Sequence, residues 1–471
     1  MSLEDTLYPL LRVYEAAPQP VKSLVGRTYR AIPPRIRYGG TYETFARDAA
    51  GVERWEPRDI AKYQLEAVRQ SLLAARQAPY YRERLQALGL DPERFTSLEQ
   101  LREYPILTKQ ELLTHREDLV NPRWPASQRL HITTGGSSGV PVGFYLHKGV
   151  SRPKEQAYLE AQWARRGWRS GERTAVIRGI VTTSRAQGRI SYYDATRNWL
   201  ILSSSHLTIE RLPEYVAALN RFRPRHLHAY PSAALMLARA MEQADVRLDF
   251  PLVSILCGSE KLSTEAQSYL EKFFGTRVLH WYGHSERVVL AAQGRGDSPH
   301  LYFWPTYGFV ELGEPNAEGD REVIGTSFHN HVMPLIRYRT GDYVRVAQTP
   351  AREWPWLEIE KVVGRDYEFL VSATGRRVSL TTINMHDRIF EGLLAVQFYQ
   401  ELAGAVECRI QAGKDWHSSR EGTIHEGLLR KLGDDFTLTL RRVDEMEKTK
   451  AGKHRWLVTR LNTQQALTPL S

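Results

Sequence analysis

The feature that most constrains the fold of this chain is an alternation of short β-like runs with helical segments, which begins at Arg173. The β-like runs are RTAVIRG from residue 173, HLHAY from residue 226 and LVSILCGSE from residue 252. Helical segments such as AALMLARAMEQA and STEAQSYLEKFF alternate with them. Strands that alternate with helices favour a sheet with helices on its faces. We therefore expect an α/β fold in which chemistry-bearing loops sit at strand ends.

Three segments are candidates for such loops, because each lies beside an apolar run. They are TTGGSSGVPVGFYLHK from residue 133, Gly258–Leu262, and HWYGHSER at 280–287. In the first segment, glycine leaves backbone N–H groups open to close approach and hydroxyls add further donors, so it can wrap a phosphate chain. A glycine-serine loop is also an ordinary connector, so its meaning depends on the rest of the chain.

The chain is long enough for two domains. With 471 residues it exceeds what one core normally holds. Residues 60–77 place apolar side chains on one helical face. We expect a large multi-layer N-terminal domain with mixed sheets over 1–364 and a small α+β C-terminal domain over 365–471, which opens with the hairpin RDYEFLVSATGRRVS. Residues 1–55 form an N-terminal extension that caps the large domain or binds a partner.

Composition indicates a cytoplasmic enzyme. Hydrophobic residues make up 42% and charged residues 25% of the chain. The longest uncharged stretch, Leu130–His147, contains the polar loop, so we expect no membrane span. The N-terminus carries two early acids and lacks a secretory pattern. Cys257 and Cys408 provide no disulfide framework.

Basic residues are concentrated in one segment of a chain whose net charge is +10. Nine basic and three acidic residues lie between Arg152 and Arg189. We expect QWARRGWRSGER, within this segment, to be a solvated helix end, with attraction of small polyanions as the alternative. We expect no nucleic-acid partner, because no recognition motif or aromatic platform accompanies the charge.

Five separated features suggest a nucleotide site when taken together. The loop Thr134–Pro141 suits phosphates, and Glu286 offers a carboxylate for Mg²⁺. Asp342 can accept from ribose hydroxyls, Arg365 can donate to the sugar or a phosphate, and Lys453 can stabilise developing negative charge.

Each of these features also has an ordinary structural explanation, so their order along the chain carries the weight. Thr-Gly-Asp and Gly-Lys are common in turns, and a glutamate is most often a surface charge. His280 and His284 have the spacing of metal ligands on a helix, but Gly283 and the absence of nearby cysteines argue against zinc.

The ordered motifs resemble the adenylate-forming superfamily, which includes acyl-CoA synthetases and peptide-synthetase adenylation domains. The motifs are TTGGSSGVP, GSEKL, YGHSE, YRTGD, GRDYEF and GKHR. The segments YQLEAVRQSLLAARQAPYYRERL and LREYPILTKQEL are similar to the phenylacetate–CoA ligase and CapK branch. The resemblance extends over about residues 60–457.

The resemblance assigns roles to individual residues. The ATP phosphates would be held by Thr134, Gly135, Gly136, Ser137, Ser138, Gly139 and Ser285. Adenine would lie against Gly258, Ser259, Glu260, Tyr282 and Gly283. Asp342 and Arg365 would bind ribose, Glu286 would hold Mg²⁺, and Lys453 would be the catalytic lysine. The chain departs from the pattern at Gly135, where serine is usual, and at Tyr367 and Glu368, which replace two acids at the domain junction.

The same resemblance implies an ATP-dependent ligase with a mobile small domain. A carboxylic acid would form an acyl-AMP, and the acyl group would pass to a thiol, with CoA as the leading acceptor. A carrier-protein thiol, an amine, or hydrolysis or release of the adenylate are alternatives. Nucleotidyl transfer to a hydroxyl and a non-catalytic role in envelope polysaccharide assembly also remain open.

The resemblance further places the acid pocket between LHAYPSAALM and HWYGH. Its candidate residues are His206, His228, Tyr230, His280 and Trp281. The aromatic rings favour a flat or apolar acid, and the histidines can orient a polar substituent. Ordinary core packing explains Tyr230 and Trp281 equally well.

Overall fold

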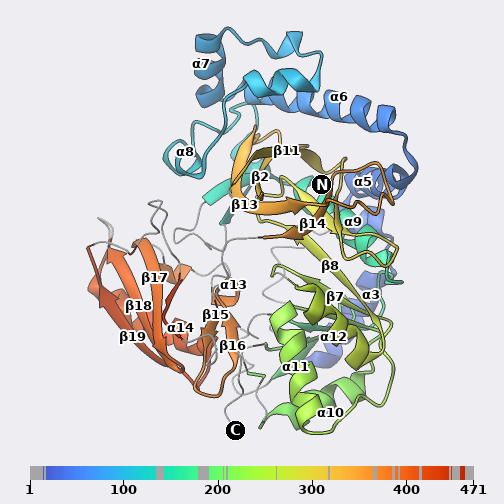
Figure 1. Ribbon diagram of the computed structural model, residues 1–471, viewed down its shortest axis with the longest axis vertical. Helices are drawn as coiled ribbons and strands as arrows, with labels where there is room; N and C mark the ends of the chain where they lie inside the picture. The colour runs from blue at the N-terminus through green and yellow to red at the C-terminus, as the bar shows by residue number, and fades with distance from the viewer. Residues whose placement is uncertain are drawn as a thin grey trace.

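The computed structural model describes Tyr14 and most of the chain from residue 17 to residue 461 (Figure 1). The described ranges are 17–133, 143–178, 190–204, 206–207, 210–260, 262–316, 319–363, 369–383, 388–390, 393–412, 416–444, residue 447 and 457–461. No helix within these ranges has both the length and the apolar composition needed to cross a bilayer.

A twelve-stranded mixed sheet forms the centre of the larger part of the molecule. In spatial order its strands are β11 (Gly308–Pro315), β12 (Arg321–Ser327), β13 (Tyr338–Val346), β14 (Glu358–Val362), β10 (Leu301–Phe303), β9 (Leu290–Gln293), β8 (Arg277–Gly283), β7 (Ser254–Gly258), β6 (His226–Ala229), β3 (Thr174–Ile177), β5 (Trp199–Leu202) and β4 (Ser191–Asp194). The pairs β3·β5, β3·β6, β6·β7 and β7·β8 are parallel, and all other neighbours are antiparallel. The expected α/β class with a mixed sheet is confirmed.

Helices cover both faces of the parallel half of the sheet (Figure 1). On one face lie α10 (Leu212–Phe222), α11 (Pro231–Gln243) and α12 (Thr264–Phe274), and on the other lie α5 (Gly40–Gly51) and α9 (Ser151–Ala164). Strands β3, β6 and β7 are buried along their whole length, as expected for parallel strands covered on both sides. Local signals also agree, since the Ser263 side chain caps α12 and a left-handed Gly275 ends it.

The antiparallel half of the sheet packs against a separate helical layer. This layer contains α6 (Pro57–Ala75), α7 (Pro79–Leu88) and α8 (Lys109–Thr114). A proline occupies the first turn of both α6 and α7, where its missing N–H costs nothing. Before α6 come α3 (Gln19–Ala31) and α4 (Pro34–Tyr38), within the predicted N-terminal extension.

The strands after β14 belong to other sheets with their own hydrophobic core. The predicted hairpin is present as β15 (Phe369–Val371) and β16 (Arg377–Ser379). A four-stranded sheet follows, in the order β19 (Thr437–Arg442), β18 (Ala405–Ala412), β17 (Leu393–Leu402) and β20 (Leu457–Thr459), with α13 (Leu380–Ile383) and α14 (Glu421–Leu432). The boundary predicted after residue 364 falls at 364–368, outside the described residues, and stays a prediction.

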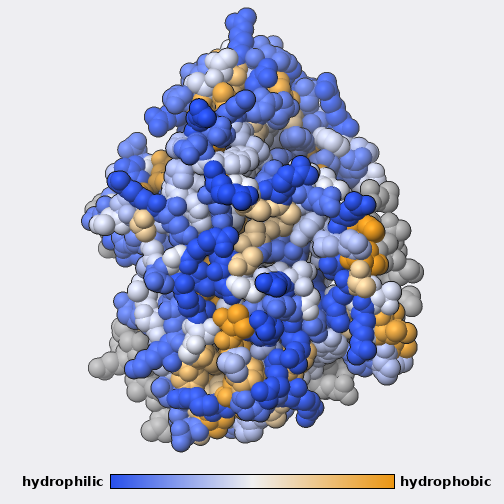
Figure 2. Space-filling model, turned by 90° about the vertical axis from the view of Figure 1, so that its right-hand side faces the viewer, coloured by the Kyte–Doolittle hydropathy of each residue, from blue (hydrophilic) through white to orange (hydrophobic). Residues whose placement is uncertain are grey.

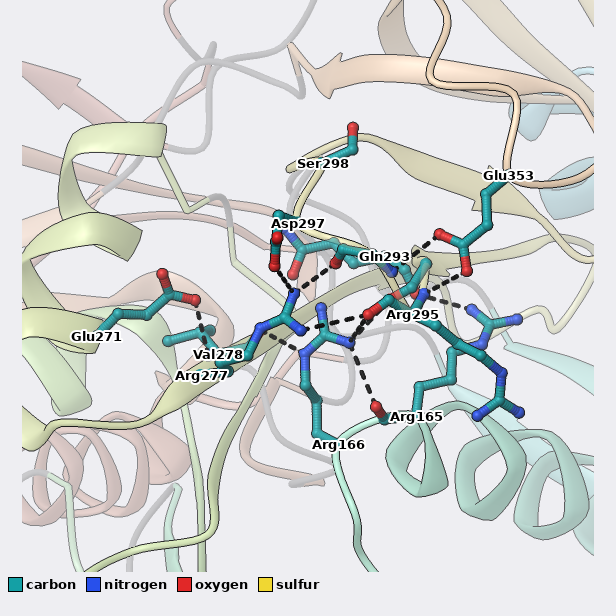
Figure 3. Close-up of polar contacts among 12 residues, drawn as sticks. Arg165, Arg166, Glu271, Arg277, Val278, Gln293, Arg295, Asp297, Ser298 and Glu353 are labelled. Atoms are coloured by element: carbon teal, nitrogen blue, oxygen red, sulfur yellow. Dashed lines mark hydrogen bonds and ion pairs between the residues drawn. The ribbon is translucent and has the colours of Figure 1, made fainter.

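The prediction that QWARRGWRSGER is a solvated helix end is wrong at its two central arginines. Arg165 and Arg166 are each 7% exposed. Arg165 donates to the backbone oxygen of Gln293 at 2.8 Å, and its guanidinium lies 4.2 Å from the Trp304 ring centroid. Arg166 donates to the carbonyl of Gly294 at 2.8 Å (Figure 3). An arginine at the end of a helix can be buried when carbonyl oxygens accept from its N–H groups and aromatic rings pack against it. The amino-acid pattern alone does not show whether such partners are present.

Candidate active site

Four parallel strands end at the same edge of the sheet and bring polar side chains together there. The register places Ile177 of β3 beside Ala229 of β6, and Gly258 of β7 beside Trp281 of β8. The residues that directly follow the four strands are Arg178, Tyr230, Ser259 and His284. Carboxyl ends of parallel strands are where α/β proteins bind ligands. This edge is therefore the candidate active site.

Glu286 is a buried, ionised carboxylate just beyond β8. Its Oε1 accepts from the Tyr338 hydroxyl at 3.0 Å, and its Oε2 lies 3.0 Å from Nδ1 of His284. Burial on its own would raise the pKa of Glu286, but the hydrogen bond and charge of His284 and the charge of Lys109 lower this pKa to about 2. The carboxylate thus stays negative at neutral pH while only 7% exposed.

Strand β13 connects Glu286 to the other predicted nucleotide residues. Tyr338 begins β13 and binds Glu286, while Asp342, four residues along the same strand, accepts from the Tyr282 hydroxyl at 2.9 Å. Tyr282 comes from β8. Residues far apart in sequence therefore meet as two hydrogen-bonded pairs that share β13, and we call the four residues the carboxylate cluster: Tyr282, Glu286, Tyr338 and Asp342.

The segment before α8 fixes the start of β13. Leu107 forms an isolated parallel bridge with Tyr338, and the Leu107 amide donates to the carbonyl of Arg337 at 3.1 Å. Lys109 begins α8 two residues later, which accounts for its electrostatic influence on Glu286. The LREYPILTKQEL segment thus contributes directly to the site.

The predicted adenine-side loop is shaped by close packing and a strained backbone. A Cβ at Gly258 would come within 2.2 Å of Cε2 of Trp281, so only glycine lets this indole lie against the loop. Ser259 has a φ of 70°, which a non-glycine residue rarely adopts. The carbonyl of Glu260 accepts from Nε2 of His280 at 2.9 Å. Gly283 ends β8, and Ser285 is half-buried in the turn that follows.

Arg178 is a site residue that sequence reasoning missed. Its Nη1 lies 2.9 Å from Nε2 of His228, its Nη2 donates to the Ser259 hydroxyl at 2.5 Å, and its guanidinium stands 4.5 Å from the Tyr230 ring centroid. A signal was present, because Arg178 is the first charged residue after the apolar run of β3. A charge at the carboxyl end of a buried strand is a candidate ligand-binding group.

His228 is a buried polar group surrounded by indoles. Its ring lies 4.9 Å from Trp163, 6.1 Å from Trp199 and 5.5 Å from Trp281, measured between centroids. Burial, followed by the charge of Arg178, lowers the pKa of His228 well below its usual value. Because Nε2 must accept from Arg178, the proton lies on Nδ1, which has no hydrogen-bond partner among the described residues.

His206 lies apart from the other predicted pocket residues. Its Nδ1 is 2.7 Å from the Ser203 hydroxyl. Burial lowers its pKa, as do the charges of Arg211 and Arg376, the latter directly before β16 in the C-terminal part. None of the contacts found for His206 within the described ranges joins it to His228, Tyr230, His280 or Trp281.

The HWYGHSER segment is not wholly a loop, because its first four residues belong to β8. His280 therefore lies on a strand, where burial lowers its pKa to about 4. Its Nε2 is already bonded to the Glu260 carbonyl, so it is not available to a metal. Across the described part of the chain, no group of three or more His, Cys, Asp or Glu side chains could hold a metal ion by itself.

Sequence comparisons place these residues in a known context. The chain is 24% identical over 326 residues to protein CapK of Staphylococcus aureus, covering 68% of this chain and 71% of CapK. It is 27% identical over 326 residues to the phenylacetate–coenzyme A ligase of Pseudomonas putida, covering 66% and 72% respectively. The chain is therefore similar in sequence to CapK and to phenylacetate–CoA ligases. No protein-family model matches it.

Solved structures of CoA ligases have a similar fold. A 2-hydroxyisobutyryl-CoA ligase in complex with 2-HIB-AMP and CoA, in the thioesterification state, aligns with a TM-score of 0.56 at 15% identity, covering 86% of this chain and 90% of that one. The same ligase in the postadenylation state gives a TM-score of 0.53 at 15% identity, covering 87% and 91%. The chain therefore shares the overall fold of this CoA ligase.

The donor set at Glu286 fits the magnesium ion that the adenylate-forming superfamily implies. Mg²⁺ is usually held by one or two carboxylates together with substrate phosphates, rather than by an all-protein cage. Glu286 is ionised, and its two hydrogen bonds leave lone pairs on both oxygens.

Several predicted residues lie outside the part of the chain that the structure describes. These are Thr134, Gly135, Gly136, Ser137, Ser138, Gly139, Arg365 and Lys453. The strands on either side of the predicted phosphate loop are described. They are β1 (Arg129–Thr133) and β2 (Gly143–His147), which pair as antiparallel strands with Thr133 opposite Gly143. Strand β1 thus ends just before the predicted phosphate loop, and β2 begins just after it.

Proposed function

We propose that this protein is an ATP-dependent ligase that activates a carboxylic acid as an acyl-AMP and then transfers the acyl group to the thiol of CoA. The observation that carries the proposal is the carboxylate cluster. It places a buried anion, an aromatic ring and a second carboxylate together at the end of β8. The homology to phenylacetate–CoA ligases supports the same activity.

The proposal gives each part of the cluster a role towards ATP. Tyr282 lies against adenine, and Asp342 accepts hydrogen bonds from the ribose hydroxyls. Glu286 holds Mg²⁺, which when bound neutralises charge on the phosphates. The carboxylate of Asp342 can exchange its bond from Tyr282 for one from ribose, so that the tyrosine ring and the sugar occupy neighbouring positions.

Residues beyond the described ranges complete this proposed arrangement. Thr134–Gly139 donate to the phosphate oxygens together with Ser285, which lies within the described ranges, and Arg365 donates to the ribose. Lys453 brings a positive charge to the α-phosphate as negative charge develops on its oxygens. We propose that the C-terminal part carrying Lys453 is a separate domain, 365–471, that moves between the two half-reactions.

The first step forms one bond and breaks one. A carboxylate oxygen of the acid attacks the α-phosphorus of ATP, and the bond from that phosphorus to the β-phosphate bridging oxygen breaks, releasing pyrophosphate. In the second step the CoA sulfur, having lost its proton, attacks the acyl carbon, and AMP departs with the carboxyl oxygen. Positioning and charge stabilisation are the protein's main contributions to both steps.

The acid proposed is aromatic or otherwise apolar. The flat apolar rings of Trp163, Trp199 and Trp281 surround His228, and the Nε2 of His228 is bonded to Arg178 at the carboxyl end of β3. Arg178 retains further N–H donors after its bonds to His228 and Ser259, because a guanidinium carries five. We propose that Arg178 directs the polar end of the acid towards the α-phosphate.

Pyrophosphate release from a panel of acids tests the proposal. Aryl, hydroxyaryl and fatty acids are each incubated with ATP and Mg²⁺, with and without CoA, and pyrophosphate, AMP and thioester are measured. We expect acid-dependent pyrophosphate release and a thioester only when CoA is present. The matched control is Glu286→Gln, which removes the charge and keeps the size of the side chain.

Other product patterns contradict the proposal. If a thioester forms with an added carrier protein, or an amide forms with an added amine, and no product forms with CoA, then CoA is not the acceptor. AMP attached stably to a hydroxyl acceptor would indicate nucleotidyl transfer. Failure to bind ATP in a calorimetric titration would favour a non-catalytic role.

A further inference from the structure

Helix α3 presents its apolar side chains to solvent. Val21 is 48% exposed, Leu24 is 69% exposed and Val25 is 45% exposed, which places them among the most exposed large apolar residues of the described chain. At helical spacing these three side chains form one stripe, which we call the α3 face. A helix of a folded protein normally turns such a stripe towards the core.

The opposite side of α3 holds the helix on the protein. A Cβ at Gly26 would lie 2.5 Å from Cβ of Ala195, so the helix backbone approaches the turn after β4 as closely as glycine permits. Arg30 donates to the Ala195 carbonyl and, at 3.3 Å, lies within hydrogen-bond distance of the Tyr193 hydroxyl. Gln19 donates to the Tyr193 carbonyl at 3.3 Å. Glycine and polar groups thus dock the helix, and the apolar stripe is left outside.

The charge around the α3 face is of one sign. Between residues 16 and 42 the chain has five basic residues, Lys22, Arg27, Arg30, Arg35 and Arg37, and no acidic residue. Arg27 and Arg35 are exposed and Lys22 is half-buried, whereas Arg37 is buried and Arg30 is bonded to Ala195. Helical spacing places Arg27 on one edge of the stripe and Lys22 on the other. Ile36 of α4, the next helix in the chain, is also 49% exposed. Figure 2 shows the side of the molecule on which α3 lies in Figure 1, with apolar and charged surface mixed in its lower half.

We propose that α3 and α4 bind the surface of an anionic lipid bilayer, with the α3 face among the upper acyl chains and the basic residues at the headgroups. An exposed apolar stripe flanked by Lys and Arg, on a helix too short to span, is the pattern of an interfacial helix. Attraction between basic side chains and anionic lipid adds to burial of the apolar side chains.

Other occupants fit the surface less well. In a symmetric dimer through this face, each basic edge would face the basic edge of the partner copy, which is unfavourable because like charges repel. A nucleic acid would satisfy the basic residues but leave Val21, Leu24 and Val25 without an apolar counterpart. A bilayer surface satisfies both features at once.

Vesicle flotation tests the proposal with the full-length protein. The probes are vesicles of pure phosphatidylcholine and vesicles in which about a quarter of the lipid is phosphatidylglycerol. We expect flotation with the anionic vesicles, little with the neutral ones, and loss of binding as salt is raised. The double variant Leu24→Glu, Val25→Glu is expected to lower the bound fraction about tenfold or more, and Arg27→Glu is expected to lower it less.

Matched controls separate this surface from general stickiness. Leu402→Glu changes an equally exposed leucine, 64% exposed, at the far end of the chain, and is expected to float like the wild type. All variants are checked for an unchanged melting temperature, since the altered side chains face solvent. The proposal would be overturned if the wild type floated equally with neutral and anionic vesicles or did not float at all. It would also be overturned if Leu402→Glu lost as much binding as Leu24→Glu, Val25→Glu. A dimer in light scattering that Leu24→Glu, Val25→Glu converts to monomer would overturn it too.

Discussion

Two buried charged regions of this protein differ in how their charges are met. On α9 and at its C-terminal end, the side chains of Lys154 and Arg165 contact backbone carbonyls and aromatic rings, and Arg165 also pairs with Glu53. In the carboxylate cluster, Glu286 meets a hydroxyl and an imidazole, and His284 is its only ion-pair partner within 4.0 Å in the described ranges. The α9 cations are enclosed by the protein itself. The carboxylate keeps negative charge that a bound cation can meet.

This difference separates a stabilising region from a candidate ligand site. Carbonyls and rings around a buried cation are fixed parts of the fold, so that cation serves the fold. A buried carboxylate that stays ionised with a pKa of about 2 and accepts only from a hydroxyl and an imidazole is a candidate ligand-binding group. Mutations in the α9 region should therefore lower stability, whereas mutations in the carboxylate cluster should lower activity.

The largest expected effect is on stability, at Arg165. Arg165→Ala removes the bond to Gln293 and the contact with Trp304 and disturbs its pairing with Glu53 at 3.0 Å. We expect the free energy of unfolding to fall by about 3–5 kcal/mol, measured by urea denaturation. The exposed Arg58, whose side chain is 87% exposed, is the control, with an expected loss of under about 0.5 kcal/mol for Arg58→Ala. If the two variants lose a similar amount of unfolding free energy, the buried arginine is no more important for stability than the exposed one.

The next effect is on activity, at Glu286. Glu286→Gln keeps the side-chain volume and removes the charge. We expect acid-dependent pyrophosphate release to fall about a hundredfold or more, equivalent to about 3 kcal/mol, with a melting temperature close to that of the wild type. A variant that loses stability instead, while activity per folded molecule is retained, would place Glu286 in the same class as Arg165.

A comparable loss of activity is expected at Lys453. Lys453→Ala should slow acyl-AMP formation about a hundredfold or more while the large domain stays folded. Pyrophosphate exchange with the cognate acid measures this step alone. A near-normal exchange rate in the variant would remove the proposed role of Lys453.

A smaller effect concerns the pH dependence of stability at Lys154. Burial lowers the pKa of Lys154 from 10.5 to about 7. Between these two pKa values the unfolded chain binds one more proton than the folded protein, so stability rises with pH across that window. From about pH 7 to about pH 9, we expect the wild type to gain about 1–2 kcal/mol relative to Lys154→Met. Parallel curves for the two proteins would show that Lys154 remains charged in the fold.

The smallest effect is expected at Tyr282. Tyr282→Phe keeps the ring and removes the donor to Asp342. We expect a change of about 1 kcal/mol or less in the apparent affinity for ATP, measured as KM in the pyrophosphate assay. A much larger loss would mean that the hydroxyl itself contacts the substrate.

Much of the fold was predictable because it follows local patterns. The α/β class, α6, α11, α12 and the β15–β16 hairpin each have a periodicity, proline or capping signal in the sequence. The burial of Arg165 and Arg166 was not predictable, because it depends on carbonyls and rings supplied by distant segments. The strand character of His280 was missed because its polar side chain interrupts the apolar pattern, while its partner, the Glu260 carbonyl, comes from another strand end.

The candidate site was predictable to a similar extent. Motifs singled out Tyr282, Glu286 and Asp342. In the structure Tyr282 is hydrogen-bonded to Asp342, and Glu286 is hydrogen-bonded to Tyr338. Tyr338 lies in the YRTGD motif but received no role, because its bond to Glu286 depends on the packing of distant segments, and Arg178 was missed because its position depends on a strand end. Gly258 was assigned to adenine, and the structure adds that Trp281 requires it.

The most direct test of the central claim is a crystal structure with ATP and Mg²⁺ bound. We predict that the ribose hydroxyls lie within hydrogen-bond distance of the Asp342 carboxylate, that adenine lies against Tyr282, and that the metal ion contacts Glu286. A nucleotide bound elsewhere, with the carboxylate cluster unchanged and its hydrogen bonds intact, would contradict the account.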